Sequence, residues 1–135
     1  MALLLDTGIL YALADEDDHW HERACELLHN RPDILLVPLT VLPEAAYLLR
    51  QRLGTEAELA LVRSIVAGEV TIQSLTHRDF GRIAAVMSRY PDIGFVDASV
   101  VVIAERLGLR TIATTDRRHF GKIRPAHLKA FELVP

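Results

Sequence analysis

Five short apolar segments alternate with longer, helix-like segments along this chain. Each apolar segment is too short for an ordinary helix, and the segment 70–75 is also rich in β-branched residues. The predicted strands are Ala2–Leu5, Asp33–Pro38, Val70–Leu75, Thr111–Thr114 and Ala130–Val134. Strands joined through helices pair in parallel, and the helices cover both faces of the sheet. The sequence therefore predicts an α/β fold with a central, mostly parallel, five-stranded sheet.

Six helices are expected between these strands, and capping patterns mark the start of three of them. Thr40 is placed to cap one helix, and Thr55 with Glu58 forms a capping-box pattern for the next. Thr76 and Asp79 provide the same chemistry further along. The predicted helices are 7–14, 19–29, 40–53, 55–67, 76–90 and 95–107. No internal repeat, low-complexity tract or linker interrupts the pattern, so residues 1–135 are predicted to form one domain.

The composition fits a globular protein of the cell interior. Of the 135 residues, 50% are hydrophobic and 24% are charged, which is typical of a folded domain with one core. Cys25 is the only cysteine, which excludes an intrachain disulfide and suits a reducing compartment. The N-terminal apolar run ends at Asp6, too early for a signal peptide or a membrane span. We therefore expect a cytoplasmic protein without a membrane segment.

The formal net charge of −3 conceals an uneven distribution. Acidic residues dominate positions 1–30, whereas basic residues dominate positions 110–129. The overall charge does not favour binding to a nucleic-acid backbone, but a local basic strip can contact one. A solvated polar face explains the same strip equally well.

Two aspartates directly follow predicted strands. Asp6 comes after the first strand and Asp116 after the fourth. In parallel sheets, ligands bind beyond the carboxyl ends of the strands, where the strand order reverses. Each aspartate taken alone is also explained as a helix cap or turn former. Together they indicate a crevice lined by carboxylates.

Two further acids interrupt strongly apolar segments. Glu44 shares a helix face with Val41 and Leu48, which are expected to point inward. Asp97 lies in a segment that is apolar nearly all round. A buried carboxylate needs a cation, because otherwise its burial costs several kcal/mol or forces it to take up a proton. Arginine is one source of that charge, but the nearby Arg50, Arg52 and Arg106 lie at helix C-termini, where they complement the helix dipoles.

Divalent metal ions are the other source of positive charge. Four acids in one crevice repel each other unless multivalent cations neutralise them, and oxygen-only ligands favour Mg²⁺ or Mn²⁺ over zinc. Such ions activate water for in-line attack on a phosphodiester and stabilise the leaving oxygen. The chemistry predicted from the four acids is therefore metal-assisted hydrolysis of phosphodiesters.

The same residues resemble the signature of the PIN-domain nucleases, and most of all the VapC-type toxins of toxin–antitoxin pairs. The resemblance runs through the segments LLLDTGILYAL, VPLTVLPEAAYLL, GFVDASVVVIAERLG and IATTDRRHF. It implies a three-layer α/β/α fold and a Mg²⁺-dependent endoribonuclease in which Mn²⁺ can substitute. By motif position, the implied catalytic and metal-binding acids are Asp6, Glu44, Asp97 and Asp116. Asp6 and Asp97 are the central ligands in this interpretation.

The resemblance also implies supporting residues and partners. Thr7 and Thr115 match hydroxyl positions that support the metal site or a phosphate, whereas Gly8 departs from the Asn or Ser more usual in the family. Arg117, Arg118 and Lys122 are candidates for holding RNA phosphates. The implied partners are an RNA substrate, a small cognate antitoxin and a second copy of the chain in a homodimer.

Alternative functions remain at this stage. A stand-alone RNA-processing nuclease and a non-catalytic RNA-binding or interaction module use the same scaffold. Receiver domains and haloacid-dehalogenase-type phosphatases fit less well, because they require a second acid beside Asp6. His119 is expected to have a turn or packing role rather than to touch RNA. The pair His19 and His21 is a poor metal clamp, because the two side chains point to different sides of a helix.

Overall fold

The sheet has five strands in the order β3-β2-β1-β4-β5, and every neighbouring pair is parallel. The computed structural model describes all residues from 1 to 135. The strands are β1 (Ala2–Leu5), β2 (Ile34–Pro38), β3 (Thr71–Gln73), β4 (Thr111–Ala113) and β5 (Glu132–Val134). All five predicted strands are confirmed, although the edge strands β3 and β5 are shorter than the apolar segments that predicted them.

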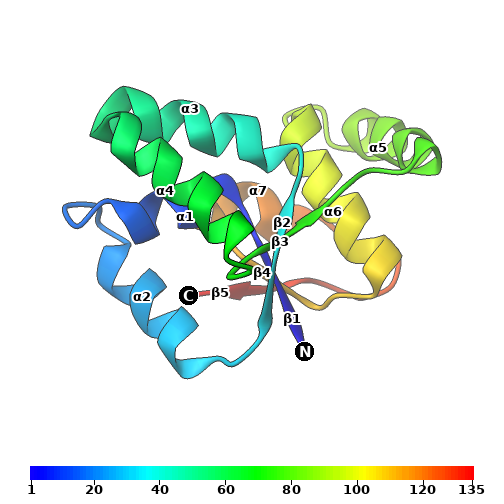
Figure 1. The fold of residues 1–135 in the computed structure, drawn as a ribbon. Helices are drawn as coiled ribbons and strands as arrows, with labels where there is room; N and C mark the ends of the chain where they lie inside the picture. The colour runs from blue at the N-terminus through cyan, green and yellow to red at the C-terminus, as the bar shows by residue number, and fades with distance from the viewer.

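Seven helices surround the sheet. They are α1 (Thr7–Ala14), α2 (His21–Asn30), α3 (Val41–Leu53), α4 (Thr55–Val66), α5 (His77–Arg89), α6 (Phe95–Leu107) and α7 (Arg117–Lys122). Figure 1 shows α1 to α4 on one side of the strands and α5 and α6 on the other. Right-handed crossovers require this division, because the chain leaves β1 in one direction and returns to β4 in the other. The predicted α/β/α arrangement is therefore confirmed, whereas the short helix α7 was not predicted.

The core lies between the central strands and the inner helices. Leu3, Leu4 and Leu5 of β1 are fully buried, as are residues 100–104 of α6. A central parallel strand is covered by helices on both faces, which explains why β1 has no alternation of polar and apolar residues. The apolar character of α6 on all sides has the same cause.

Only one of the three predicted capping patterns forms its side-chain hydrogen bonds. Thr40 is the N-cap residue of α3, as predicted, but its side chain makes no cap hydrogen bond and instead pairs with Ser99 Oγ at 2.5 Å. The α4 helix begins directly after Gly54, and neither Thr55 nor Glu58 caps it. The third pattern is confirmed: Thr76 and Asp79 form a reciprocal capping box at the start of α5.

The strand order reverses between β1 and β4. From β1 the chain proceeds outward to β2 and β3, and it then crosses to β4 on the other side. The backbone N–H of Asp6 donates to the carbonyl of Ala113 at 3.0 Å, so the carboxyl ends of these two strands lie together. The fold therefore places a ligand crevice where Asp6 and Asp116 leave the sheet.

Candidate active site

The four predicted acids line one open pocket. This pocket has a volume of about 570 Å³ and includes the side chains of Asp6, Glu44, Asp97 and Asp116. Asp6 and Asp116 are the residues immediately before α1 and α7, whereas Glu44 and Asp97 lie in the first turns of α3 and α6. Acids at helix N-termini are stabilised by the helix dipole. Residues distant in the sequence thus meet because four helices begin at this edge of the sheet.

Asp6 is the most buried of the four acids, with 6% of its surface exposed. The hydroxyl of Thr114 donates to Asp6 Oδ2 at 3.0 Å. Burial raises the pKa of Asp6 from 3.8 to about 6, and the negative charges of Asp97 and Glu44 act in the same direction. Hydrogen bonds from Thr7 and Thr114 oppose this rise. Asp6 is therefore a carboxylate that a nearby cation would stabilise in its charged form.

Asp97 and Glu44 differ in their exposure. Asp97 is half-buried, and its pKa is raised by burial and then by the negative charge of Asp116. Glu44 is exposed, so the expectation of an inward-facing Glu44 is wrong. The helix buries Val41, Ala45 and Leu49 in the core, whereas Glu44 lies at the rim of the pocket and is open to solvent. Neither acid has an arginine or lysine within 4.0 Å, and Arg106 pairs instead with Asp79 at 3.1 Å.

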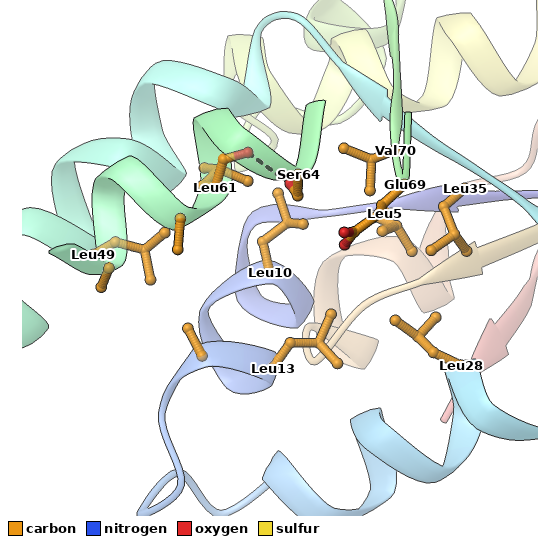
Figure 2. A pocket seen from close by; sticks show the side chains of 13 residues that line it. Leu5, Leu10, Leu13, Leu28, Leu35, Leu49, Leu61, Ser64, Glu69 and Val70 are labelled. Carbon is orange, nitrogen blue, oxygen red and sulfur yellow. Dashed lines mark hydrogen bonds between the residues drawn. The ribbon is translucent and has the colours of Figure 1, made fainter. Parts of the chain in front are cut away.

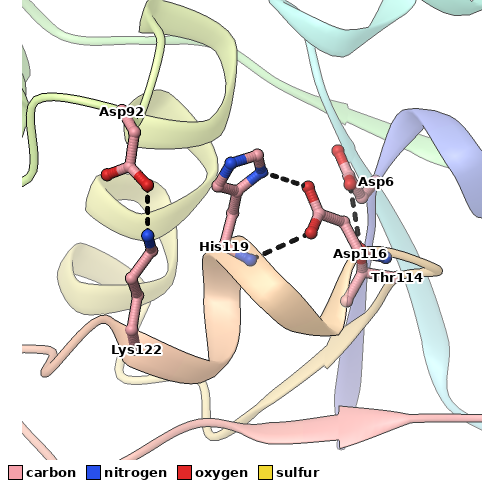
Figure 3. Close-up of polar contacts among 6 residues, drawn as sticks. All are labelled: Asp6, Asp92, Thr114, Asp116, His119 and Lys122. Atoms are coloured by element: carbon pink, nitrogen blue, oxygen red, sulfur yellow. Dashed lines mark hydrogen bonds and ion pairs between the residues drawn. The ribbon is translucent and has the colours of Figure 1, made fainter.

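Asp116 is held by His119 three residues later. The backbone N–H of His119 donates to Asp116 Oδ1 at 2.9 Å, and its ring Nδ1 lies 2.7 Å from Oδ2 (Figure 3). The backbone N–H of Asp116 in turn donates to Thr114 Oγ1 at 2.9 Å. Asp116 thus has the capping role that a turn aspartate commonly has, and its carboxylate still lines the pocket.

Thr7 and Thr115 both line the pocket, as the sequence led us to expect. The Thr7 hydroxyl oxygen is buried and has no hydrogen-bond partner in the protein. A buried hydroxyl without a partner costs about 1–3 kcal/mol, so such a group usually serves a ligand or an ordered water. The orphaned hydroxyl and the surrounding carboxylate oxygens together fit a hard divalent cation with its waters.

The three bases expected to hold RNA lie outside the lining of this pocket. Arg117 donates to the backbone carbonyl of Pro135, and its guanidinium lies 6.0 Å from the ring of Trp20. Lys122 pairs with Asp92, as Figure 3 shows. Arg118 is exposed on α7. All three project from α7, the short helix that directly follows Asp116, so they flank the acids.

Thr114 is the site residue that sequence reasoning missed. Its side chain is fully buried, and it connects Asp6 to the backbone of Asp116. Two adjacent threonines precede Asp116, and we singled out only Thr115. The available signal was the strand pairing, because β4 neighbours β1 and the first residue beyond β4 lies beside the first residue beyond β1.

A second, apolar cleft lies away from the acids. Its volume is about 250 Å³, and most of its lining side chains are hydrophobic. Figure 2 shows Leu10 and Leu13 of α1, Leu28 of α2 and Leu61 of α4 around it. None of the seven helices has the length and hydrophobicity that a membrane span requires.

The fold and the acidic pocket define the class of the protein. The family model for the PIN domain matches residues 3–124, and the chain belongs to this family. The expected family is therefore confirmed. The chain is 34% identical to ribonuclease VapC26 of Mycobacterium tuberculosis, a match that covers 98% of this chain and 100% of the relative.

Solved structures support the same fold. The Mycobacterium tuberculosis toxin VapC20, described as cleaving the sarcin-ricin loop, superimposes with a TM-score of 0.80 at 22% identity, covering 87% of this chain and 92% of that one. A toxin–antitoxin complex from Klebsiella pneumoniae gives a TM-score of 0.73 at 19% identity, covering 90% and 92% of the two chains. At these identities the likeness concerns the fold.

Proposed function

We propose that this PIN-domain protein is a divalent-metal-dependent endoribonuclease that hydrolyses RNA phosphodiester bonds as the toxin of a VapBC-like pair. One observation carries the catalytic part: four carboxylates from four separate segments line one pocket that contains no arginine or lysine. The similarity to ribonuclease VapC26 over the whole chain supports RNA as the substrate and a toxin role.

Mg²⁺ is the proposed cofactor, and Mn²⁺ is expected to substitute for it. Asp6 and Asp97 would hold the ion, with Asp116 beside them and Glu44 at the exposed rim. A bound ion of this kind lowers the pKa of a water molecule and neutralises charge that develops on the phosphate. Thr7 and Thr115 offer hydroxyls beside the acids, toward the ion's waters or a phosphate oxygen.

Other residues in and beside the pocket are proposed to orient these acids and to bind the substrate. Thr114 holds Asp6 and His119 holds Asp116, so both carboxylates have fixed directions before any ligand arrives. Arg118, Arg117 and Lys122 are proposed to contact RNA phosphates next to the pocket. Arg117 and Lys122 would first have to leave Pro135 and Asp92.

Cleavage of mixed cellular RNA by the purified chain, free of any partner, tests this function. Wild type and an Asp97→Asn variant would be incubated with excess EDTA, with Mg²⁺ and with Mn²⁺. An Asp17→Asn variant, which changes an exposed carboxylate outside the pocket, is the matched control. We expect discrete fragments that require metal, persist with Asp17→Asn and disappear with Asp97→Asn. Folded wild-type protein that cuts no RNA would favour a binding module instead.

The apolar cleft of Figure 2 is the proposed contact for the cognate antitoxin. A mostly hydrophobic cleft of about 250 Å³ between α1, α2 and α4 suits apolar side chains of a small partner. Ala60 lies on its exposed edge. Growth arrest on expression should be relieved by the product of a small adjacent gene. Ala60→Arg should lose that relief and keep cleavage, whereas Ala60→Ser should retain both. A chain that no neighbouring gene neutralises would be a stand-alone nuclease.

We also propose that the protein is a homodimer. Phe80 of α5 and Phe95 of α6 are 50% and 41% exposed, and their rings stack with centroids 6.1 Å apart. Large exposed aromatic side chains in contact with each other mark association surfaces. Sedimentation should give a dimer for wild type and a monomer for Phe80→Ser. A monomeric wild type would refute this part alone.

A further inference from the structure

His119 is the one basic side chain in the lining of the acidic pocket. Twelve residues line the pocket, and the other titratable ones are the four carboxylates. The histidine therefore faces the same space as the acids. The sequence led us to expect a turn or packing role for His119, and a side chain in the lining of the acidic pocket can do more than that.

The backbone fixes where this imidazole lies. Asp116 precedes α7, and its carboxylate caps the helix by accepting a hydrogen bond from the His119 N–H at 2.9 Å. The two side chains are about equally accessible, at 30% for His119 and 34% for Asp116. Figure 3 shows the ring beside the Asp116 carboxylate, with Lys122 turned away toward Asp92. The imidazole is thus held at the pocket while remaining open to solvent and ions.

Asp97, Asp116 and His119 come close enough to share one ion. One potential ligand atom of each lies within 4.8 Å of the others. Two ligands of one ion with bonds of about 2.1 Å lie at most about 4.2 Å apart, so only small side-chain rotations are required. We propose that His119 is a direct nitrogen ligand that forms, with Asp97 and Asp116, a mixed nitrogen–oxygen position selective for Mn²⁺ over Mg²⁺.

The nature of the ligand set determines this selectivity. Mg²⁺ takes oxygen ligands and keeps several waters, whereas imidazole suits transition-metal ions. A site of carboxylates alone would therefore bind the two ions by charge, with modest discrimination. Adding one imidazole favours the ion that accepts nitrogen. The inference rests on the proposed metal-dependent function, and it adds to that site a nitrogen ligand and a higher affinity for Mn²⁺ than for the Mg²⁺ proposed above.

A role as a positioning residue is the competing explanation. His119 then only orients Asp116 through the contact between Nδ1 and Oδ2. Loss of the ring would then weaken the binding of Mn²⁺ and of Mg²⁺ equally, because both ions are bound by Asp116. No nitrogen would be bound to the metal in that case. The two explanations therefore differ in a spectroscopic observable as well as in the pattern of affinities.

Pulsed electron paramagnetic resonance of the protein with Mn²⁺ alone tests the ligand directly. Bound imidazole nitrogen gives a characteristic echo modulation. We expect this modulation in wild type and in His77→Gln, a matched control that changes an exposed histidine on α5. It should be absent in His119→Gln. Bound Mn²⁺ without nitrogen modulation in wild type would overturn the inference and leave the carboxylate site intact.

Calorimetric titration of the same proteins measures the selectivity. His119→Gln should weaken Mn²⁺ binding about tenfold or more and change Mg²⁺ binding much less. Equal loss for both ions would identify His119 as a positioning residue and contradict direct ligation. A wild-type chain that binds neither ion and cuts no RNA would refute the proposed function itself. Thermal unfolding of each variant ensures that these differences come from folded protein.

Discussion

Gly8 and Thr115 compete for one volume at the acidic pocket. A β-carbon added at Gly8 would lie well inside 3.0 Å of Oγ1 of Thr115, closer than β-carbons approach such atoms in proteins. Both residues line the pocket. Position 8 resembles a family position where Asn or Ser is usual, and Thr115 gives the physical reason for glycine in this chain.

The clash predicts strong coupling between these two positions. Gly8→Ala should destabilise the protein by about 1–3 kcal/mol, because overpacking forces its surroundings to move. Combining it with Thr115→Ala should recover most of this loss, since the β-carbon of Thr115 lies at 3.4 Å, an acceptable contact. Thr115→Val keeps the branched shape and should not rescue. Urea unfolding of the four proteins measures the coupling energy. Additive effects would show that the two side chains do not share this space.

Asp6 predicts an unusual pH dependence for the metal-free protein. Its pKa is about 6 in the folded state and near 3.8 otherwise, so the folded state binds the proton more tightly. The stability from this group is fully present below about pH 3.8 and is lost as the pH rises through about 6. At pH 7.5 in EDTA, Asp6→Asn should therefore be more stable than wild type, by about 2–3 kcal/mol.

Chemical unfolding between pH 4 and pH 8 measures this effect. The advantage of Asp6→Asn should shrink as the pH falls toward 4, where Asp6 becomes neutral. Adding Mn²⁺ at pH 7.5 should reverse the order, because only the charged carboxylate holds the ion. An Asp6→Asn variant less stable than wild type in EDTA at every pH would contradict the buried, repelled carboxylate described here.

Thr114 is predicted to support both Asp6 and Asp116. Thr114→Val keeps the shape but removes the hydroxyl that donates to Asp6 and accepts from the Asp116 N–H. Both groups then lose a partner in a buried setting, which costs about 1–3 kcal/mol. Thr114→Ser should retain most of the stability and the metal affinity. Thermal unfolding and Mn²⁺ titration would measure both, and a Thr114→Val protein indistinguishable from wild type would refute this role.

Asp79 is predicted to act on stability alone. It is 5% exposed, caps α5 and pairs with Arg106 of α6 at 3.1 Å. Asp79→Ala should destabilise the fold by about 1–2 kcal/mol, because Arg106 loses its partner and the capping box of α5 loses the hydrogen bond from the Thr76 N–H to Asp79 Oδ2. The folded fraction should bind Mn²⁺ with unchanged affinity, as calorimetry below the unfolding temperature would measure. A large loss of affinity per folded molecule would instead connect this pair to the pocket.

The strands and the acids could be predicted because each has a recognisable local pattern in the sequence. Buried parallel strands are continuous apolar runs, and an isolated acid such as Asp97 is conspicuous within one. The helix α7 was missed because six mostly polar residues have no apolar periodicity. Glu44 was expected to face inward from its spacing to Val41 and Leu48, but spacing alone cannot distinguish the core from the rim of a crevice.

The contacts around the acids could not be predicted from the sequence, because they join residues that are distant in the chain. Thr40 and Ser99 are distant in the chain, so their hydrogen bond, which forms in place of the predicted cap bond, follows only from the tertiary fold that brings α6 beside the start of α3. The same holds for Thr114 with Asp6. His119 follows Asp116 by three residues, but its closeness to Asp97, which makes it a candidate metal ligand, follows only from the tertiary structure.

Titration of the metal-free protein with Mn²⁺ tests most directly whether the four acids form one metal site. Wild type, Asp97→Asn, Glu44→Gln and the surface control Asp17→Asn would be compared by calorimetry at one pH. Wild type and Asp17→Asn should bind with equal affinity, Asp97→Asn should bind at least about tenfold more weakly, and Glu44→Gln should fall between them because Glu44 is exposed. Equal Mn²⁺ affinity in all four folded proteins would contradict the account.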